Sequence, residues 1–251
     1  LTDDEYEQSD PDIWGDWVVW SDWRNGNGDV YAKNVATGEE RAVCTDAALQ
    51  QRPKICDDVI VWEDERSGDW SIFYYRLSTT ESGSITAGSD RSPDVYRAAS
   101  GYVIAWEAYE DLYVYNIDTS QLRIPLEYIY GATLVAGDDE FVFARLEDRD
   151  GSGVSIPYLY RYSWSDDTVT ELETTYAPYP EFRKLSVSGD RVAYTYYDGL
   201  SFHVSVHDWV QGTDVPVTSV ASSQANPAIA GDMVVWQDDR NFAPEAEYYN
   251  L

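Results

Sequence analysis

A short segment that ends in an aromatic residue recurs six times along this chain of 251 residues. In each copy a polar turn, usually Gly-Asp or Asp-Asp, leads into an aliphatic run that stops at the aromatic side chain. Successive anchors lie 42, 44, 37, 51 and 42 residues apart, at Trp20, Trp62, Trp106, Phe143, Tyr194 and Trp236. A recurring period of this length is the signature of an architecture in which one supersecondary unit repeats. The sequence therefore predicts six copies of one such unit.

Each repeat has the pattern of four short strands. A Pro-x-Ile/Val segment such as 11–13 comes first, and the anchored run follows it as the second strand of a tight hairpin. An alternating segment such as 29–35 then precedes a last short strand, for example 40–43. Four antiparallel strands of this kind form one propeller blade, whereas a sandwich or an open barrel does not require the unit to recur. We therefore predict an all-β fold, a six-bladed β-propeller of four-stranded antiparallel blades.

The repeat also sets the expected organisation of the chain. We expect residues 1–251 to form a single domain, with blades at approximately 8–49, 50–89, 90–126, 127–175, 176–223, and 224–251 plus 1–7. The first four residues match the end of a fourth strand, and the last repeat stops after its third strand. We expect the N-terminal segment to join the last blade and so to close the ring.

Three short motifs accompany the anchors. They are Gln-x-x-Pro, Gly-Asp before the aliphatic run, and Trp-x-Asp-x-Arg, which occurs as Trp20/Asp22/Arg24, Trp62/Asp64/Arg66 and Trp236/Asp238/Arg240. With these motifs the chain resembles the TolB-like propeller repeat, in particular the versions found in prokaryotic, often archaeal, cell-surface proteins. The resemblance covers nearly the whole chain, although the fourth and fifth repeats lack the Trp and the Arg. It implies a secreted or periplasmic interaction platform.

The net charge of −29 restricts the partners. Such a surface repels nucleic acid and anionic membranes, and it tolerates cations, basic partners and high salt. No segment reaches the roughly 20 apolar residues that span a bilayer, and the first residues are not those of a signal peptide. We expect an extracellular or cell-surface protein that binds a protein or a cell-surface glycan, in a surface layer for example. The acidity is equally that of a salt-adapted protein.

The Asp–Arg pairs beside the anchors have two interpretations. As a structural feature, each is an ion pair that fixes the loop between the second and third strands. As a functional feature, the loop charges frame a binding face together with exposed aromatic side chains, which can stack on sugars or fill a protein interface. The candidate binding residues are Trp23, Arg24, Arg66, Trp70, Tyr109 and Arg240, and Trp14 is a further exposed aromatic residue.

One segment resembles half of a calcium-binding loop. Asp148, Asp150 and Ser152 alternate as oxygen ligands, and a glycine allows a sharp bend, but the distal bidentate Glu is missing. A polar hairpin tip explains the same residues, and we expect no other cofactor.

The two cysteines, Cys44 and Cys56, also leave two interpretations open. They either form a disulfide, which would stabilise the fold by about 3 kcal/mol and indicate an oxidising compartment, or they are two buried free thiols.

Nothing in the sequence has the pattern of an active site. His203 and His207 would lie about 13 Å apart on one strand, too far to share a zinc ion, and there is no Gly-x-Ser-x-Gly elbow. We therefore predict a non-catalytic binding or structural module that acts through one propeller face. The alternative is a carbohydrate-active enzyme, a glycoside hydrolase or lyase, with acids from different blades converging at the central channel.

Overall fold

The structure is a computed structural model that describes residues 2, 5–86, 88–127, 134–137, 140–149, 151–153, 156–172, 185–219 and 222–240. All regular structure in these residues is β-strand. Within them there is no helix of the length and apolar character that a membrane crossing requires. The chain divides into two compact units, Leu1–Tyr128 and Ile129–Leu251.

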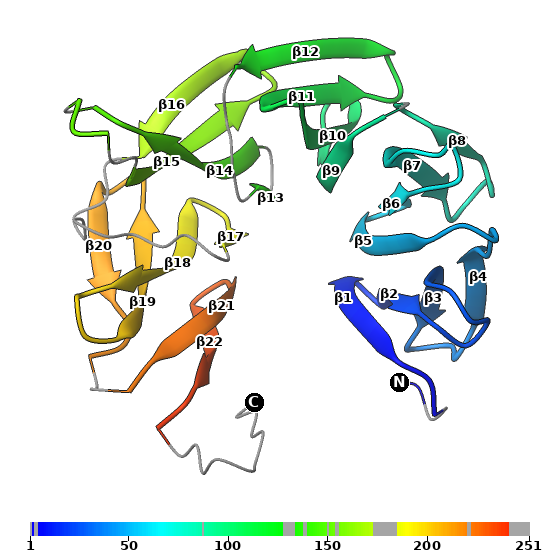
Figure 1. Ribbon diagram of the computed structural model, residues 1–251, viewed down its shortest axis with the longest axis horizontal. Coiled ribbons are helices and arrows are strands. Elements are labelled where there is room, and N and C mark those ends of the chain that lie inside the picture. The colour runs from blue at the N-terminus through cyan, green and yellow to red at the C-terminus, as the bar shows by residue number, and fades with distance from the viewer. Residues whose placement is uncertain are drawn as a thin grey trace. The chain divides into compact units, whose positions relative to one another are not determined.

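The first unit contains three four-stranded sheets, each a meander of strands in sequence order (Figure 1). The first sheet has β1 (Gln8–Trp14), β2 (Trp17–Asp22), β3 (Asp29–Asn34) and β4 (Glu40–Cys44). The second has β5 (Gln50–Cys56), β6 (Val59–Asp64), β7 (Ser71–Arg76) and β8 (Ser82–Ser84). The third has β9 (Asp90–Ala98), β10 (Gly101–Ala108), β11 (Asp111–Asn116) and β12 (Gln121–Leu126). All neighbouring strands are antiparallel.

The second unit repeats the same meander. Its sheets are β13 (Leu134–Ala136), β14 (Glu140–Glu147), β15 (Ile156–Ser163) and β16 (Thr168–Leu172), then β17 (Ser186–Ser188), β18 (Arg191–Tyr197), β19 (Phe202–Asp208) and β20 (Thr213–Pro216). The last sheet has two strands in the described residues, β21 (Gln224–Ala230) and β22 (Met233–Asp238). The predicted all-β fold of four-stranded antiparallel sheets is therefore confirmed, while the number of six blades stays a prediction. Leu1, Asp3, Asp4 and residues 241–251 lie outside the described residues, so ring closure and the single-domain boundaries stay predictions.

In the first five sheets the aromatic anchors are buried together with the aliphatic run before them, whereas Trp236 and its run in the last sheet are only partly buried. Trp62 is 1% exposed and lies over Phe73 of the adjacent strand, with ring centroids 5.9 Å apart. The same cross-strand pairing joins Trp20 to Tyr31, Trp106 to Tyr113 and Phe143 to Tyr160. Aromatic pairs across adjacent strands stabilise a sheet beyond the area they bury. The repeat anchor is thus first of all a packing residue.

In the first unit, one end of the sheets carries two kinds of connection, those between second and third strands and those from one sheet to the next. The backbone N–H of Gln50 donates to the Gly28 carbonyl at 2.8 Å, and that of Asp90 donates to the Trp70 carbonyl at 3.0 Å. At Gly28 a Cβ atom would lie 2.9 Å from the Gln50 carbonyl oxygen, so a glycine permits this close approach. We call this end, formed by residues 23–28, 45–49, 65–70, 85–86, 88–89 and 109–110, the arginine-loop end.

Candidate functional site

At the arginine-loop end of the first sheet, a buried carboxylate joins the anchor tryptophan to an arginine. The indole Nε1 of Trp20 donates to Asp22 Oδ2 at 2.8 Å, and Arg24 Nε donates to Asp22 Oδ1 at 2.9 Å. The guanidinium of Arg24 lies over the Tyr31 ring, 4.2 Å from its centroid. Burial disfavours the charged form of Asp22, but the hydrogen bonds from Arg24 and Trp20 outweigh it and lower the pKa of Asp22. This unit ties the loop to the core.

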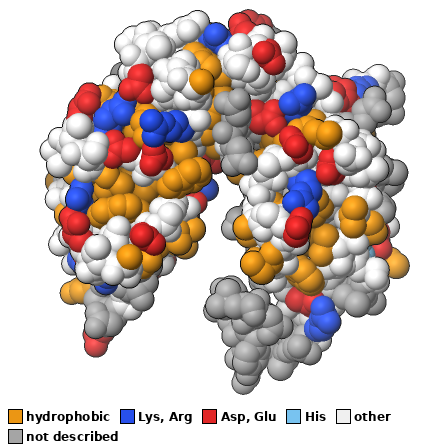
Figure 2. All heavy atoms as spheres, turned by 180° about the vertical axis from the view of Figure 1, so that it is seen from behind, with side chains coloured by type: hydrophobic (Ala, Val, Ile, Leu, Met, Phe, Trp, Pro, Cys, Tyr) orange, Lys and Arg blue, Asp and Glu red, His pale blue; other side chains and the backbone are white. Residues whose placement is uncertain are grey.

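The second sheet repeats this unit. Arg66 Nε donates to Asp64 Oδ1 at 2.9 Å, and its guanidinium lies 4.3 Å above the centroid of Phe73. Arg66 Nη2 also lies 2.7 Å from the sulfur of Cys44, on the last strand of the preceding sheet. In the second unit, Arg240 pairs with Asp238 in the same way. Figure 2 shows acidic and basic side chains beside one another on the face it draws.

The fourth and fifth repeats use other residues for the same purpose. Arg149 Nη1 pairs with Glu171 at 2.9 Å and Arg149 Nε with Glu147 at 2.5 Å. In the fifth repeat, His203 Nε2 lies 3.0 Å from Asp198 Oδ2. Sequence reasoning missed these pairs because Glu147 follows its anchor by four residues, whereas Asp22 follows Trp20 by two.

The third sheet departs from this pattern. Its second and third strands are joined by the two residues Tyr109 and Glu110, both at positive φ, where the first two sheets have six-residue loops at 23–28 and 65–70. The shorter turn has no arginine. Trp106 Nε1 donates instead to Asp90 Oδ1 at 2.9 Å. Asp90 pairs with Ala108 across the strands, as Gln50 pairs with Asp64 in the second sheet.

The carboxylate of Asp90 is buried and only partly satisfied. Asp90 is 4% exposed, and its Oδ2 has no hydrogen-bond partner within bonding geometry among the described residues. Burial raises the pKa of Asp90, although the Thr86 hydroxyl, the Trp106 indole and the Gly88 N–H favour its charged form. Gln50 and Gln224, at the same repeat position, also have one buried oxygen without a partner. Asp90 differs from them because it is an acid and because it lines a cavity.

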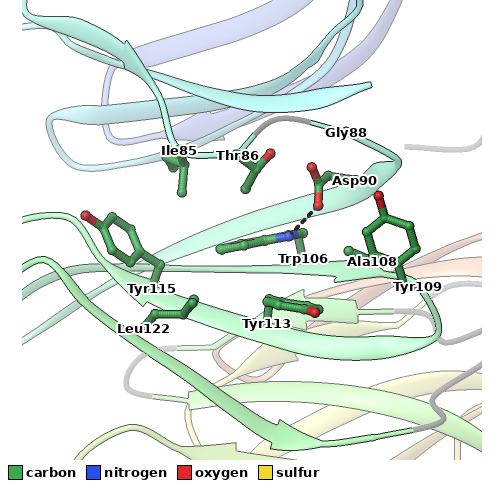
Figure 3. Close-up of a pocket in the computed structure, with 10 residues that line it drawn as sticks. All are labelled: Ile85, Thr86, Gly88, Asp90, Trp106, Ala108, Tyr109, Tyr113, Tyr115 and Leu122. Carbon is green, nitrogen blue, oxygen red and sulfur yellow. Dashed lines mark hydrogen bonds between the residues drawn. The ribbon is translucent and has the colours of Figure 1, made fainter. Parts of the chain in front are cut away.

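That cavity has a volume of about 310 Å³. Figure 3 shows Asp90 and Tyr109 on one side of it and Ile85 and Tyr115 on the other. Its walls come from the connection between the second and third sheets and from β9 to β12, and the lining residues are Ile85, Thr86, Gly88, Asp90, Trp106, Ala108, Tyr109, Tyr113, Tyr115 and Leu122. Tyr109 is 72% exposed at the rim. A concave site lined by aromatic and aliphatic side chains with a few polar groups, here Asp90 and Thr86, is the usual form of a ligand site.

The candidate residues from the sequence are thus distributed over several places. Tyr109 and the anchor Trp106 line the cavity. Trp70 lies under the guanidinium of Arg91, 4.2 Å away, and Trp23 covers Gly28. The candidate arginines are engaged in the ion pairs described above, and Trp14 lies at the other end of its sheet, beside the turn between β1 and β2. The structure brings Tyr109 together with residues that sequence reasoning had not placed beside it.

A second group of charges lies on the first strands of the three sheets. Asp12 on β1, Lys54 on β5 and Asp94 on β9 interact electrostatically, with β5 next to both other strands. Burial, with a smaller contribution from Asp94, raises the pKa of Asp12 to about 6. Asp12 Oδ2 accepts a hydrogen bond from the Ile55 N–H at 2.9 Å. The sequence signal that could have found this group is the charged residue that follows Pro in each of the first three repeats.

The hydrogen bond that Asp12 accepts from the neighbouring sheet is made elsewhere by an uncharged side chain. In the second unit the Ser186 hydroxyl accepts from the Ile229 N–H at 3.1 Å, as Asp12 accepts from Ile55. The role of Asp12 is therefore to join the first strands of neighbouring sheets, a role that a neutral side chain fills elsewhere in the chain.

The disulfide interpretation is wrong. Cys44 and Cys56 are both free thiols. Cys44 ends β4 at the arginine-loop end, whereas Cys56 lies at the far end of β5, six residues beyond Gln50 and thus about 20 Å along the strand. Bridged cysteines have Cα atoms less than about 7 Å apart.

The calcium-loop residues and the histidines belong to the second unit, whereas the cavity belongs to the first. Asp148 Oδ2 accepts from the Gly153 N–H at 2.9 Å, which closes the turn, while Asp150 lies outside the described residues. His207 Nδ1 lies 3.3 Å from Asp214, a different carboxylate from the one beside His203. The described parts of the chain contain no cluster of three or more His, Cys, Asp or Glu side chains that could hold a metal ion.

Comparison with known proteins identifies the fold. No family profile and no curated protein sequence matches the chain. Among solved structures, TolB from Acinetobacter baumannii is 13% identical with a TM-score of 0.59, over 89% of this chain and 57% of that one. The nidogen/laminin complex matches at 13% identity and a TM-score of 0.55, over 93% and 84%. Oligogalacturonate lyase in complex with manganese matches at 16% identity and 0.56, over 81% and 62%.

These likenesses establish the architecture and leave the activity open. The chain has a TolB-like β-propeller fold. It spans a little over half the length of TolB. Propellers of this kind occur both in a complex between proteins and in an enzyme, so the function has to be argued from the site itself.

Proposed function

We propose that this protein is a non-catalytic, extracellular or cell-surface binding module that recognises a protein or a glycan through the arginine-loop end of its first unit. The observation that carries the proposal is the aromatic cavity beside Asp90, at the end of the sheets where the longest loops of this unit lie. Rigid sheets that present a binding surface on their connecting loops are a common arrangement.

The placement of the acids supports binding over catalysis. Asp22, Asp64 and Asp238 are each held by an arginine. The acids that do come together from different sheets, Asp12 and Asp94, have Lys54 between them. A glycosidase needs one carboxyl group that donates a proton and another that attacks or activates water, and carboxylates neutralised in this way are poorly suited to it.

Binding on peptide and glycan arrays tests this proposal. Tyr109→Ala at the rim of the cavity has a matched control in Trp14→Ala, because both residues are exposed aromatics beside hairpin turns at opposite ends of the sheets. We expect Tyr109→Ala to weaken array binding and Trp14→Ala to leave it unchanged, with every bound ligand recovered at its original mass. Cleavage of a bound ligand, or loss of binding in Trp14→Ala alone, would contradict the proposal.

A further inference from the structure

We propose that the cavity beside Asp90 binds the guanidinium group of an arginine side chain from a partner polypeptide. This inference rests on the proposed function and names the chemistry that the binding module recognises. Its basis is a comparison between the third sheet and the two sheets before it in the chain.

The second sheet shows how the fold holds a guanidinium at this position. Arg66 lies on the Phe73 ring, bonds to the carboxylate that holds the anchor indole, and reaches Cys44 on the preceding sheet. Each of these neighbours has a counterpart in the third sheet. Tyr113 occupies the position of Phe73, stacked on the anchor tryptophan. Ile85 and Thr86 correspond to Cys44, because these residues lie at or directly after the end of the last strand of the preceding sheet.

The carboxylate is present as well, but it comes from another strand. Asp90 bonds to the Trp106 indole as Asp64 bonds to that of Trp62. In the third sheet the two-residue turn at Tyr109 supplies no arginine. The cavity therefore corresponds to the space that the Arg66 guanidinium fills in the second sheet. Arg91, the next residue after Asp90, lies over Trp70, which is not among the lining residues.

The unpaired oxygen of Asp90 indicates a cationic ligand. A buried carboxylate oxygen without a partner is costly, and a donor that carries positive charge relieves that cost most. A guanidinium also stacks on aromatic rings and donates in a planar fork, which an ammonium group cannot do. The overall charge of −29 would attract a basic polypeptide to the site.

Calorimetry with defined probes tests the inference. The probes are N-acetyl-arginine amide, the citrulline analogue, which is isosteric but neutral, the lysine analogue, and a peptide with a central arginine. We expect the arginine amide to bind at least about tenfold more tightly than the citrulline analogue, because it adds a charge-assisted contact. The arginine peptide should bind more tightly than the amide, and the lysine analogue more weakly.

Variants locate the binding. Asp90→Asn and Tyr113→Leu should each weaken arginine-amide binding about tenfold or more, and Asp16→Asn, which removes an exposed carboxylate at the other end of the first sheet, should not. Asn keeps an oxygen that can accept from Trp106, so Asp90→Asn is expected to fold, and its circular dichroism and thermal melting check this. Equal binding of the arginine and citrulline probes, or full binding to a folded Asp90→Asn variant, would overturn the inference.

The outcome is distinct from that of the array experiment. If an array ligand depends on Tyr109 but is not displaced by arginine amide, the binding function stands and the guanidinium inference fails. If free arginine amide binds as tightly as the peptide, the partner is a small guanidinium compound and the polypeptide part of the inference is wrong.

Discussion

Asp90 on β9 accepts a hydrogen bond from the indole of Trp106 on β10 at 2.9 Å, whereas Asp22 accepts the corresponding bond from Trp20 on the same strand at 2.8 Å. The bond to the anchor is thus kept while its acceptor moves to the neighbouring strand. Asp22 has Arg24 as a cationic partner, and the two-residue turn of the third sheet provides none for Asp90.

Binding of arginine amide should weaken at acidic pH. A cation binds the ionised carboxylate, and burial raises the pKa of Asp90, so affinity should start to fall at a higher pH than an ordinary Asp would give. Calorimetry between pH 4 and 7 measures this. The other charged groups that interact with the site are Asp111, which acts on Tyr113, and Arg91, which acts on Asp90. The dependence should therefore be much smaller in Asp90→Asn, and an equal dependence in that variant would contradict the assignment to Asp90.

Replacement of Arg66 by Ala should destabilise the fold. Asp64 is fully buried and would lose its cationic partner, which costs about 2–4 kcal/mol of unfolding free energy. Arg191→Ala is the matched control, because its partner Asp232 is 99% exposed and 2.9 Å away, so the interaction contributes less than about 1 kcal/mol. Urea unfolding measures both losses. Equal losses would mean that the buried pair does not hold the loop.

The free energy of unfolding of Asp12→Asn should increase relative to that of the wild type as the pH rises. The folded-state pKa of Asp12 is raised to about 6, chiefly by burial, so the folded state binds this proton more tightly than the unfolded state. Stability due to this group is therefore present at pH 4 and lost as the pH rises through 6. Relative to wild type, the variant should gain up to about 2 kcal/mol between pH 4 and pH 7. A difference that stays constant over this range would contradict the coupling.

Both cysteines should be found as thiols. In the unfolded chain two iodoacetamide groups should be incorporated without reductant, and in the folded protein Cys56 should be protected, because burial raises its pKa to about 12. Cys44 is half-buried with a raised pKa and should react slowly. Mass spectrometry counts the incorporated groups. An unlabelled chain with a mass lower by two hydrogens would show that the disulfide forms.

The fold could be predicted from the sequence because its signal is repeated. The anchors Trp20 and Trp62 are buried in equivalent places, and their spacing alone indicates the four-stranded unit. An ion pair that is kept in a repeat but made by residues at other positions could not be predicted in this way. In the fourth repeat the ion pair is made by Glu147 and Arg149, which lie further along the chain from the anchor than Asp22 and Arg24 do, and no local sequence pattern indicates this pair.

The cavity could not be predicted because it arises from what one repeat lacks. The turn at Tyr109 is shorter than its counterparts. Whether this leaves a cavity lined by a carboxylate depends on Asp90, which lies sixteen residues before Trp106 and contacts it only because β9 pairs with β10. Alignment of the repeats shows the missing arginine, but not that a buried carboxylate takes over the bond to the indole. The free thiols illustrate the same limit, since Cys44 and Cys56 are twelve positions apart in the sequence, yet one ends β4 and the other ends β5.

The most direct test of the account is a crystal structure of the protein with N-acetyl-arginine amide. We predict a guanidinium stacked on Tyr113, with one of its nitrogens within hydrogen-bonding distance of Asp90 Oδ2, in the arrangement that Arg66 has with Phe73 and Asp64. A cavity without the probe at concentrations that saturate binding in solution, or a probe held elsewhere on the surface, would contradict it.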